Sequence, residues 1–139
     1  MVVFELNSEG GVGLVFTDRY VDESGWVSSY ALHARAPGFH AEIRVENPGF
    51  GFPPSVLFED IASHWSGWNG EKGWSALEGE CAFAATCDST GHITLTLRLL
   101  PHALPPCWHA QVALVLEAGS LERVARDAAT FFERQRRGA

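Results

Sequence analysis

The chain has 139 residues, a length that fits one domain with a core of its own and needs neither metals nor disulfides. Its composition, 46% hydrophobic with 12% aromatic and 19% charged residues, excludes intrinsic disorder. The net charge of −7 argues against nucleic acid as a partner, because an acidic body repels phosphates, and it favours a basic partner protein. We therefore expect residues 1–139 to form a single domain.

Membrane contact and secretion are not expected. No stretch approaches eighteen apolar residues, and the start of the chain lacks the basic and apolar regions of a signal peptide. Cys81, Cys87 and Cys107 form no Cys-x-x-Cys pair and leave one thiol over, which argues against a disulfide framework and a structural zinc site. We expect a cytoplasmic protein with reduced, buried thiols and no cofactor.

The first part of the chain predicts strands. Residues 12–16 and 27–34 are apolar, β-branched or aromatic runs separated by a turn-rich segment. Residues 39–46 alternate apolar with polar side chains, which is typical of a strand with one buried face. Pro37-Gly38 lies between the last two, so they are expected to form a hairpin.

A helix is predicted after the proline- and glycine-rich segment 47–54. It begins at Pro54 or Ser55, and its core face extends to Trp65. The apolar side chains on this face are Leu57, Phe58, Ile61, Ala62 and Trp65.

The second part of the chain predicts a further sheet region and a terminal helix. Residues 80–87 and 92–100 form a hairpin closed by Asp88-Ser-Thr-Gly91, and residues 108–117 form another strand. A helix follows over about 120–136. The fold class is α+β: a mostly antiparallel curved sheet of about six to seven strands with two helices packed on one face.

Residues 65–79 form a glycine-tryptophan block that holds three of the five tryptophans and four glycines. In a structural interpretation, Trp65 ends the first helix on its core face, and Trp68 and Trp74 close over the sheet. In a functional interpretation, Trp68 stays partly exposed on a loop tip, because aromatic residues beside polar ones dominate binding hot spots. Both interpretations can hold.

The functional interpretation defines a candidate binding surface. Acidic side chains near Trp68 would cover a basic site on a partner, and charge would steer the association. The candidate binding residues are Trp68, Asn69, Glu71, Lys72, Glu78 and Glu80.

Catalytic and metal sites have weaker support. The carboxylates Glu71, Glu78 and Glu80 are equally explained as a solvated rim paired with Lys72, and the chain has no nucleophile elbow, dinucleotide fingerprint or Walker sequence. A metal set could be built from Cys87, Asp88 and His92, joined by Cys107 or His109. Turn formation explains Asp88 and His92 more simply. No catalytic residue and no metal ligand is therefore expected.

The sequence from Gly67 to Glu80, followed by Ala84-Ala-Thr-Cys-Asp-Ser-Thr-Gly-His-Ile-Thr-Leu, resembles a family of small bacterial proteins of uncharacterised function. The resemblance covers about residues 58–121. More distantly, the layout is similar to that of immunity proteins encoded beside polymorphic toxins. The resemblance implies no catalytic residue, and Cys87 stands where such proteins commonly have histidine.

These observations predict a protein-binding domain without catalysis, specifically an immunity protein that neutralises a toxin by occluding its site. The alternative is a small-molecule binder or enzyme with a pocket between sheet and helices. A cavity lined by Trp26, Tyr30, Trp74 and Trp108 would favour that alternative. A filled core with acidic residues outside would favour protein binding, and an uncharged apolar patch would favour self-association.

Overall fold

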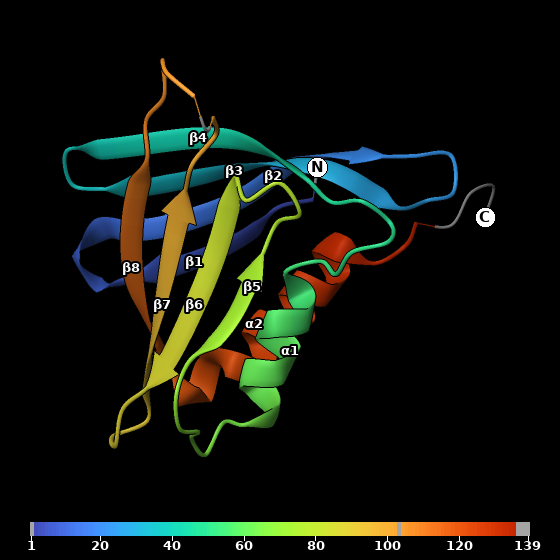
Figure 1. The fold of residues 1–139 in the computed structure, drawn as a ribbon. Coiled ribbons are helices and arrows are strands. Elements are labelled where there is room, and N and C mark those ends of the chain that lie inside the picture. The colour runs from blue at the N-terminus through green and yellow to red at the C-terminus, as the bar shows by residue number, and fades with distance from the viewer. Residues whose placement is uncertain (1, 103, 136–139) are drawn as a thin grey trace.

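The computed structural model describes residues 2–102 and 104–135, and in these ranges the chain forms eight strands and two α-helices (Figure 1). The first sheet holds β1 (Phe4–Ser8), β2 (Val12–Val21), β3 (Val27–Ala36) and β4 (Phe39–Glu46). The second holds β5 (Lys72–Ser75), β6 (Cys81–Cys87), β7 (His92–Leu99) and β8 (Ala110–Glu117). The helices are α1 (Ser55–Ser63) and α2 (Leu121–Phe132), and short 3₁₀ turns η1 (Glu9–Gly11) and η2 (Ala118–Ser120) precede β2 and α2.

The α+β class and the antiparallel pairing are confirmed, but the sheet arrangement differs from the prediction. Instead of one curved sheet of six to seven strands, two four-stranded sheets run in the orders β1-β2-β3-β4 and β5-β6-β7-β8. The two sheets cross in Figure 1, and α1 lies between β4 and β5 in the chain. The proline-rich segment and α1 therefore separate β4 from β5, which belong to different sheets.

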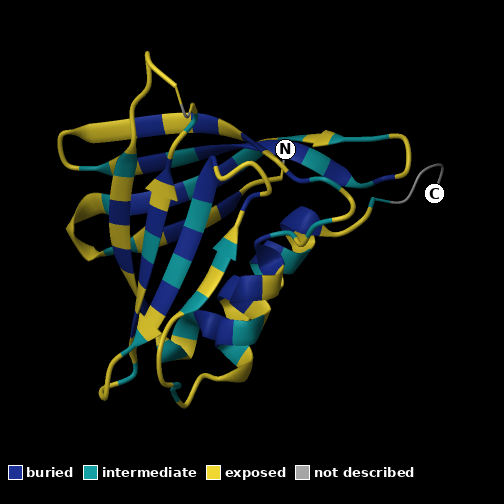
Figure 2. Ribbon diagram, in the orientation of Figure 1, coloured by how far each residue is buried: buried dark blue, intermediate teal, exposed yellow. Residues whose placement is uncertain are grey.

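The two helices pack against each other and complete a core shared with both sheets, rather than covering one face of a single sheet (Figure 2). Phe16 of β2 lies at the centre of this core. Its ring centroid is 5.0 Å from Phe4, 6.1 Å from Phe83 of the opposite sheet and 6.1 Å from Phe131 of α2. Aromatic rings therefore join both sheets to α2 within one buried core.

Both helices end earlier than the sequence predicts. The helix α1 ends at Ser63, where the N–H of His64 donates to Ile61, so Trp65 lies beyond the helix and is 65% exposed. The expectation that Trp65 lies on the core face is therefore wrong. After α2, Glu133 is extended and the backbone N–H of Gln135 donates to Gly25 O at 2.7 Å. The rest of the predicted helix, residue 136, lies outside the described residues.

The thiols follow the prediction only in part. Cys81 is buried, Cys87 is half-buried and Cys107 is exposed, and all three are free. Cys107 is exposed because it lies in the loop between β7 and β8. Within the described ranges, no helix is long and apolar enough to cross a membrane.

Candidate functional site

Trp68, the centre of the predicted binding surface, is half-buried and packs against the core. Lys72 places its Nζ 5.4 Å from the centre of the indole ring and forms an ion pair of 3.0 Å with Asp60 of α1. The Trp68 Nε1 is buried and has no hydrogen-bond partner in the described part of the chain. Trp68 and Lys72 thus help to join β5 to α1.

The six predicted site residues are divided between the two ends of β5. Trp68 and Lys72, with Asn69 and Glu71, lie where β5 begins, whereas Glu78 and Glu80 lie in the turn that follows it. Lys72 pairs with Ala85 near the end of β6, while Glu80 directly precedes the start of β6. The five-residue step from Glu80 to Ala85, the partner of Lys72, separates the two groups by roughly 17 Å. The structure therefore does not bring these six residues into one surface.

Glu78 and Glu80 also differ in environment. Gly79 between them has a φ of +77°, a turn conformation that favours glycine, so the residues do not continue a strand with a common face. Glu78 is exposed, whereas Glu80 is buried and its Oε2 accepts the backbone N–H of Glu46 at 3.2 Å. Glu80 thereby covers one position on the outer edge of β4.

A hollow that we call the aromatic groove lies between loop 47–54 and β5, with a volume of about 330 Å³. Phe52, Trp74 and Leu77 contribute side chains to it, and Glu46 lies on its rim. Phe52 is 75% exposed and Leu77 59%, and Phe50, two residues before Phe52, is 81% exposed. Large exposed apolar side chains gathered at one place are a feature of interaction surfaces.

The loop that carries these side chains is held by two indole hydrogen bonds. Trp74 Nε1 donates to Phe52 O at 2.6 Å, and Trp26 Nε1 donates to Asn47 O at 2.6 Å. Asn47 is itself buried, and its Nδ2 donates to Val27 O at 2.7 Å. The sequence predicts only a break in regular structure here. The signal for a surface is the Phe-Gly-Phe-Pro-Pro segment, which puts two aromatic rings where no strand can bury them.

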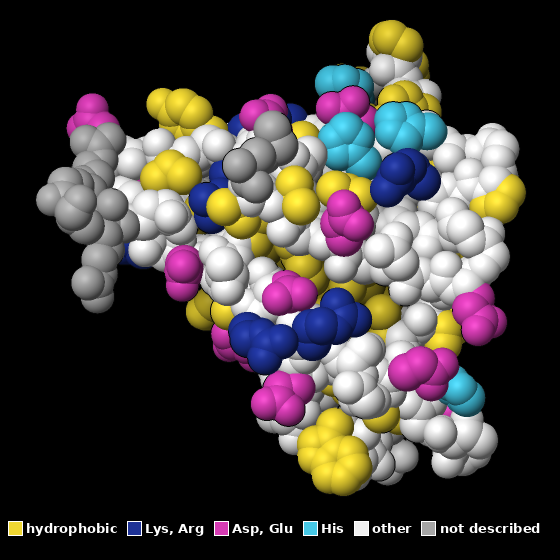
Figure 3. All heavy atoms as spheres, turned by 180° about the vertical axis from the view of Figure 1, so that it is seen from behind, with side chains coloured by type: hydrophobic (Ala, Val, Ile, Leu, Met, Phe, Trp, Pro, Cys, Tyr) yellow, Lys and Arg dark blue, Asp and Glu magenta, His cyan; other side chains and the backbone are white. Residues whose placement is uncertain are grey.

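A second hollow, larger than the aromatic groove, is bounded by β1, β8 and the start of α2 and has a volume of about 660 Å³; we call it the edge cleft. Seen from behind, apolar side chains lie in a recess with acidic and basic side chains around it (Figure 3). Leu6, Leu116 and Val124 are apolar residues of its lining, and Glu5 and Glu9 are among its acidic ones. A volume of this size lies within the range of ligand pockets.

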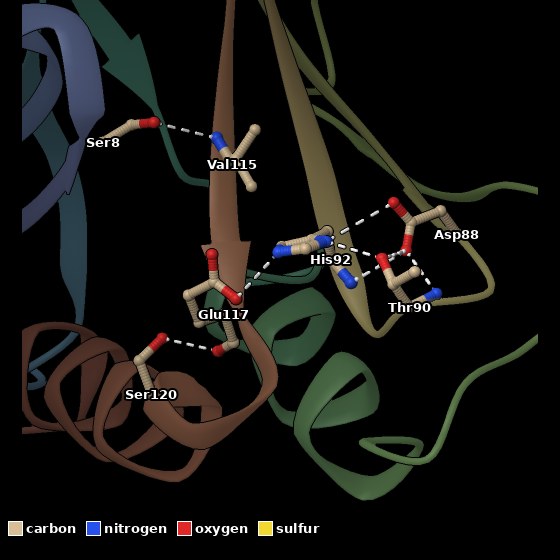
Figure 4. Close-up of polar contacts among 7 residues, drawn as sticks. All are labelled: Ser8, Asp88, Thr90, His92, Val115, Glu117 and Ser120. Carbon is tan, nitrogen blue, oxygen red and sulfur yellow. Dashed lines mark hydrogen bonds and ion pairs between the residues drawn. The ribbon is translucent and has the colours of Figure 1, made fainter.

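His92 lies at one side of the edge cleft in a chain of polar contacts (Figure 4). Its Nδ1 is 2.7 Å from Thr90 Oγ1, and its Nε2 is 3.3 Å from the Glu117 carboxylate. The Thr90 hydroxyl donates to Asp88 Oδ1 at 2.7 Å, and this oxygen also accepts the backbone N–H groups of Thr90 and His92. The hydroxyl of Thr90, then those two N–H groups, hold the pKa of Asp88 below its ordinary value.

These contacts determine the role of the Nδ1 atom of His92. The Asp88 carboxylate can only accept, so it takes the single hydroxyl hydrogen of Thr90. Nδ1 of His92 then donates to Thr90 Oγ1, and Nε2 lies beside the Glu117 carboxylate. The arrangement links the β6–β7 turn to the end of β8.

The metal set considered from the sequence is not assembled. Asp88 and His92 are neighbours, with Nδ1 3.6 Å from Oδ2, but the Cys87 thiol donates to the backbone carbonyl of Asp88. No three His, Cys, Asp or Glu side chains among the described residues could hold a metal ion.

The cavity expected for a small-molecule site is not formed by the residues named for it. Tyr30 is fully buried within the core, and burial raises the pKa of its hydroxyl well above the ordinary value. Trp26 bonds to Asn47, Trp74 lies in the aromatic groove, and Trp108 lines a different hollow beside β4. The four side chains therefore do not meet around one space.

Two crossed antiparallel sheets, two helices at their open side and hollows along the sheet edges define a small α+β fold. The chain belongs to the family of unknown function DUF6228, whose model matches residues 5–135. Neither a curated protein nor a solved structure matches the chain. The prediction of a small uncharacterised family is confirmed in this form, and the similarity to immunity proteins stays a prediction.

Proposed function

We propose that this chain is a protein-binding domain without catalytic activity, and that the aromatic groove is its recognition surface. The observation that carries the proposal is the exposure of Phe52 and Leu77, which line the groove with Trp74, and of Phe50 on the same loop. Aromatic side chains on a well-ordered surface dominate the binding energy of protein interfaces. The core is filled by other residues, so packing does not require these side chains.

The charge of the chain supports a basic partner. The net charge is −7, and Glu46 on the rim of the groove and Glu78 beside Leu77 are both exposed. An apolar centre with an acidic rim suits a basic surface that carries an apolar side chain at its middle. Charge would accelerate the encounter and make it dependent on salt.

The hydrogen bonds of the loop support recognition with little reorganisation. Trp26 and Trp74 bond to the backbone on both sides of Phe50. A loop ordered before binding loses less entropy when its partner arrives. The groove can thus act as a preformed surface.

The specific form of the proposal is neutralisation of a toxin in the bacterial cytoplasm. In this role the chain is an immunity protein that covers the basic active or nucleic-acid-binding site of its toxin and excludes the substrate. The proposal moves the contact surface from Trp68 to the other end of β5, where Trp74, Leu77 and Glu78 of the glycine-tryptophan region lie.

The test is affinity capture from a lysate of the source organism with three tagged baits: wild type, the double variant Phe50→Ser and Phe52→Ser, and Tyr20→Ser as a matched control. Tyr20 is also an exposed aromatic residue, but it lies on β2. We expect wild type and Tyr20→Ser to recover the same basic protein at low salt, and the double variant to lose it. Recovery of that protein by all three baits would refute the groove as the surface. The purified partner would then be assayed for activity that wild type inhibits and the double variant does not.

One observation favours the alternative of a small-molecule binder, the volume of the edge cleft. This cleft does lie between a sheet edge and a helix, as that alternative requires. However, His92 Nε2 lies beside the Glu117 carboxylate and not beside a hydroxyl or thiol that the ring could activate. Thermal-shift screening of a metabolite collection would test it, with a stabilising compound that fails to stabilise a Glu117→Gln variant as the supporting result.

A further inference from the structure

The edge cleft lies where the open edges of the two sheets approach each other. In the strand orders, β1 is the outer strand of the first sheet and β8 is the outer strand of the second. An outer strand leaves the backbone N–H and C=O groups of every second residue without a partner in its own sheet. The cleft is lined by the unbroken run from Glu5 to Glu9 and by Val115 to Glu117.

The hydrogen bonds of the second sheet show which residues of β8 direct their backbone groups toward the cleft. Asp88 N donates to His92 O, so these two residues form a hydrogen-bonded pair, and bonded pairs alternate along an antiparallel ladder. The registers of β6 with β7 and of β7 with β8 carry this alternation to β8. The backbone N–H and C=O groups of Leu116 then point toward β7, and those of Val115 point outward. Val115 N indeed donates to Ser8 Oγ at 3.1 Å, a contact from one sheet edge to the other (Figure 4).

The same reasoning applies to β1. Asn47 N donates to Ser28 O, and the registers of β3 with β4, β2 with β3 and β1 with β2 carry the alternation to the outer strand. Phe4, Leu6 and Ser8 bond to β2. The backbone N–H and C=O groups of Glu5 and Asn7 therefore point toward the open edge, where the cleft lies.

The side chains around this edge differ on its two faces. Glu5 and Glu9 are exposed, and Glu117 extends from β8, so carboxylates line the rim. On the inner side, Leu6, Leu116 and Val124 are buried apolar residues. Arg123 is the one Lys or Arg residue among the described residues that line the cleft.

We propose that the edge cleft binds an extended peptide segment as an additional strand on β1, and that basic side chains alternate with apolar ones along this segment. Its backbone pairs with Glu5 and Asn7, its apolar side chains cover Leu6 and Val124, and its basic side chains meet Glu5, Glu9 and Glu117. Strand addition uses backbone bonds for affinity and alternate side chains for specificity. This site lies on different elements from the aromatic groove and does not depend on it.

The test uses two synthetic nine-residue peptides, one with Lys alternating with Val and one with Glu alternating with Val, each titrated into ¹⁵N-labelled full-length protein. We expect the basic peptide to shift the amide signals of residues 5–9 and 115–117 and the acidic peptide to leave them unchanged. Equal binding of both peptides, or shifts confined to other residues, would overturn the proposal.

Two variants at one position separate the backbone from the side chain. Asn7→Pro removes the N–H that points to the cleft, and proline is tolerated on edge strands where that N–H faces outward. Asn7→Ala removes the side chain and keeps the N–H. We expect Asn7→Pro to weaken the basic peptide at least about fivefold, as loss of one hydrogen bond implies, and Asn7→Ala to bind within about twofold of wild type.

Equal affinity of both Asn7 variants would refute strand addition. Should Asn7→Pro fail to give a folded spectrum, Glu5→Gln with Glu9→Gln decides the matter, since unchanged affinity at low salt would refute the role of the carboxylates. The Phe50→Ser and Phe52→Ser double variant should bind the peptide like wild type, so failure of the groove proposal and failure of this one are separate results.

Discussion

Trp74 of β5 donates its indole N–H to the backbone carbonyl of Phe52, at 2.6 Å across the aromatic groove. This bond joins a strand of the second sheet to the loop that leaves the first sheet, and it lies directly beside the exposed ring of Phe52. The same tryptophan packs its ring near Phe83, with the ring centres 6.0 Å apart. One side chain therefore connects the core to the proposed recognition loop.

Replacing Trp74 by Phe should loosen this loop, because the ring is partly kept and the donor is lost. We expect a loss of about 1 kcal/mol in the free energy of unfolding, faster amide exchange over residues 50–53, and weaker partner capture. Urea denaturation and hydrogen exchange measure the first two effects.

Trp68→Phe is the matched control, since Trp68 has an indole N–H without a partner in the described residues. Both variants lose the same atoms, so the difference between them reports the hydrogen bond. If Trp68→Phe destabilised the protein as much as Trp74→Phe and loosened residues 50–53 equally, the bond to Phe52 would not hold the loop.

Asn47 is expected to be important for stability although no chemistry depends on it. Its side-chain amide donates to Val27 O within the buried region, and its backbone carbonyl accepts the indole N–H of Trp26. Asn47→Ala leaves the Val27 carbonyl without that donor, which should cost about 1–3 kcal/mol by urea unfolding. Asn69→Ala, at an exposed position, should change stability by less than about 0.5 kcal/mol. Similar values for the two variants would contradict the importance of this bond.

The strands that the sequence predicted correctly are those with long periodic patterns. The alternation over 39–46 and the turn at Asp88–Gly91 define β4 and the β6–β7 hairpin in the structure. Two strands were not foreseen. In β1 only Phe4 and Leu6 alternate, too few residues for a period, and β5 contains Gly73 beside Trp74, so local propensity favours a loop. These two strands form because β1 pairs with β2 and β5 pairs with β6, and the local sequence does not indicate this pairing.

The candidate surfaces depend on these two unforeseen strands. The predicted site is divided because β5 lies between Trp68 and Glu78. The edge cleft is present because β1 is the outer strand of its sheet. The contact between His92 and Glu117 could not be read from the sequence either, because it depends on the register of β7 with β8. Sequence patterns indicate which faces of the strands are buried, whereas the candidate surfaces depend on the order of the strands in the two sheets.

Stability should depend on pH through Asp88. Hydrogen bonds from the Thr90 hydroxyl, then from the backbone N–H groups of His92 and Thr90, lower the pKa of this carboxyl from its ordinary value of 3.8. A carboxyl whose pKa is lower in the folded state contributes stability above its unfolded pKa, and this contribution is lost as pH falls through the folded value. Wild type should therefore lose stability below about pH 3.8 more steeply than Asp88→Asn, which cannot titrate there.

Urea midpoints measured from pH 6 to pH 2 test this dependence. The difference in stability between wild type and Asp88→Asn should be constant above about pH 4 and decrease at lower pH, since only wild type takes up the proton. Thr90→Val removes the largest cause of the lowered pKa and should reduce the effect. A difference that stayed constant down to pH 2 would show that the Thr90 and His92 contacts do not favour the charged carboxylate.

The three thiols should differ sharply in reactivity because their surroundings differ. Cys107 is exposed and Cys87 half-buried, whereas Cys81 is buried, and its burial together with the nearby Glu80 carboxylate raises the pKa of its thiol well above the ordinary value. Since the thiolate is the reactive form, iodoacetamide at pH 8 should modify Cys107 first, Cys87 more slowly and Cys81 only in denaturant, as followed by peptide mass spectrometry. Glu80→Gln tests the cause: burial is the larger contribution, so Cys81 should stay protected in that variant as long as the fold is intact. Modification of native Cys81 at the rate of Cys107 would mean that the interior between the sheets opens readily, and the packed core around Phe16 would then not describe the protein in solution.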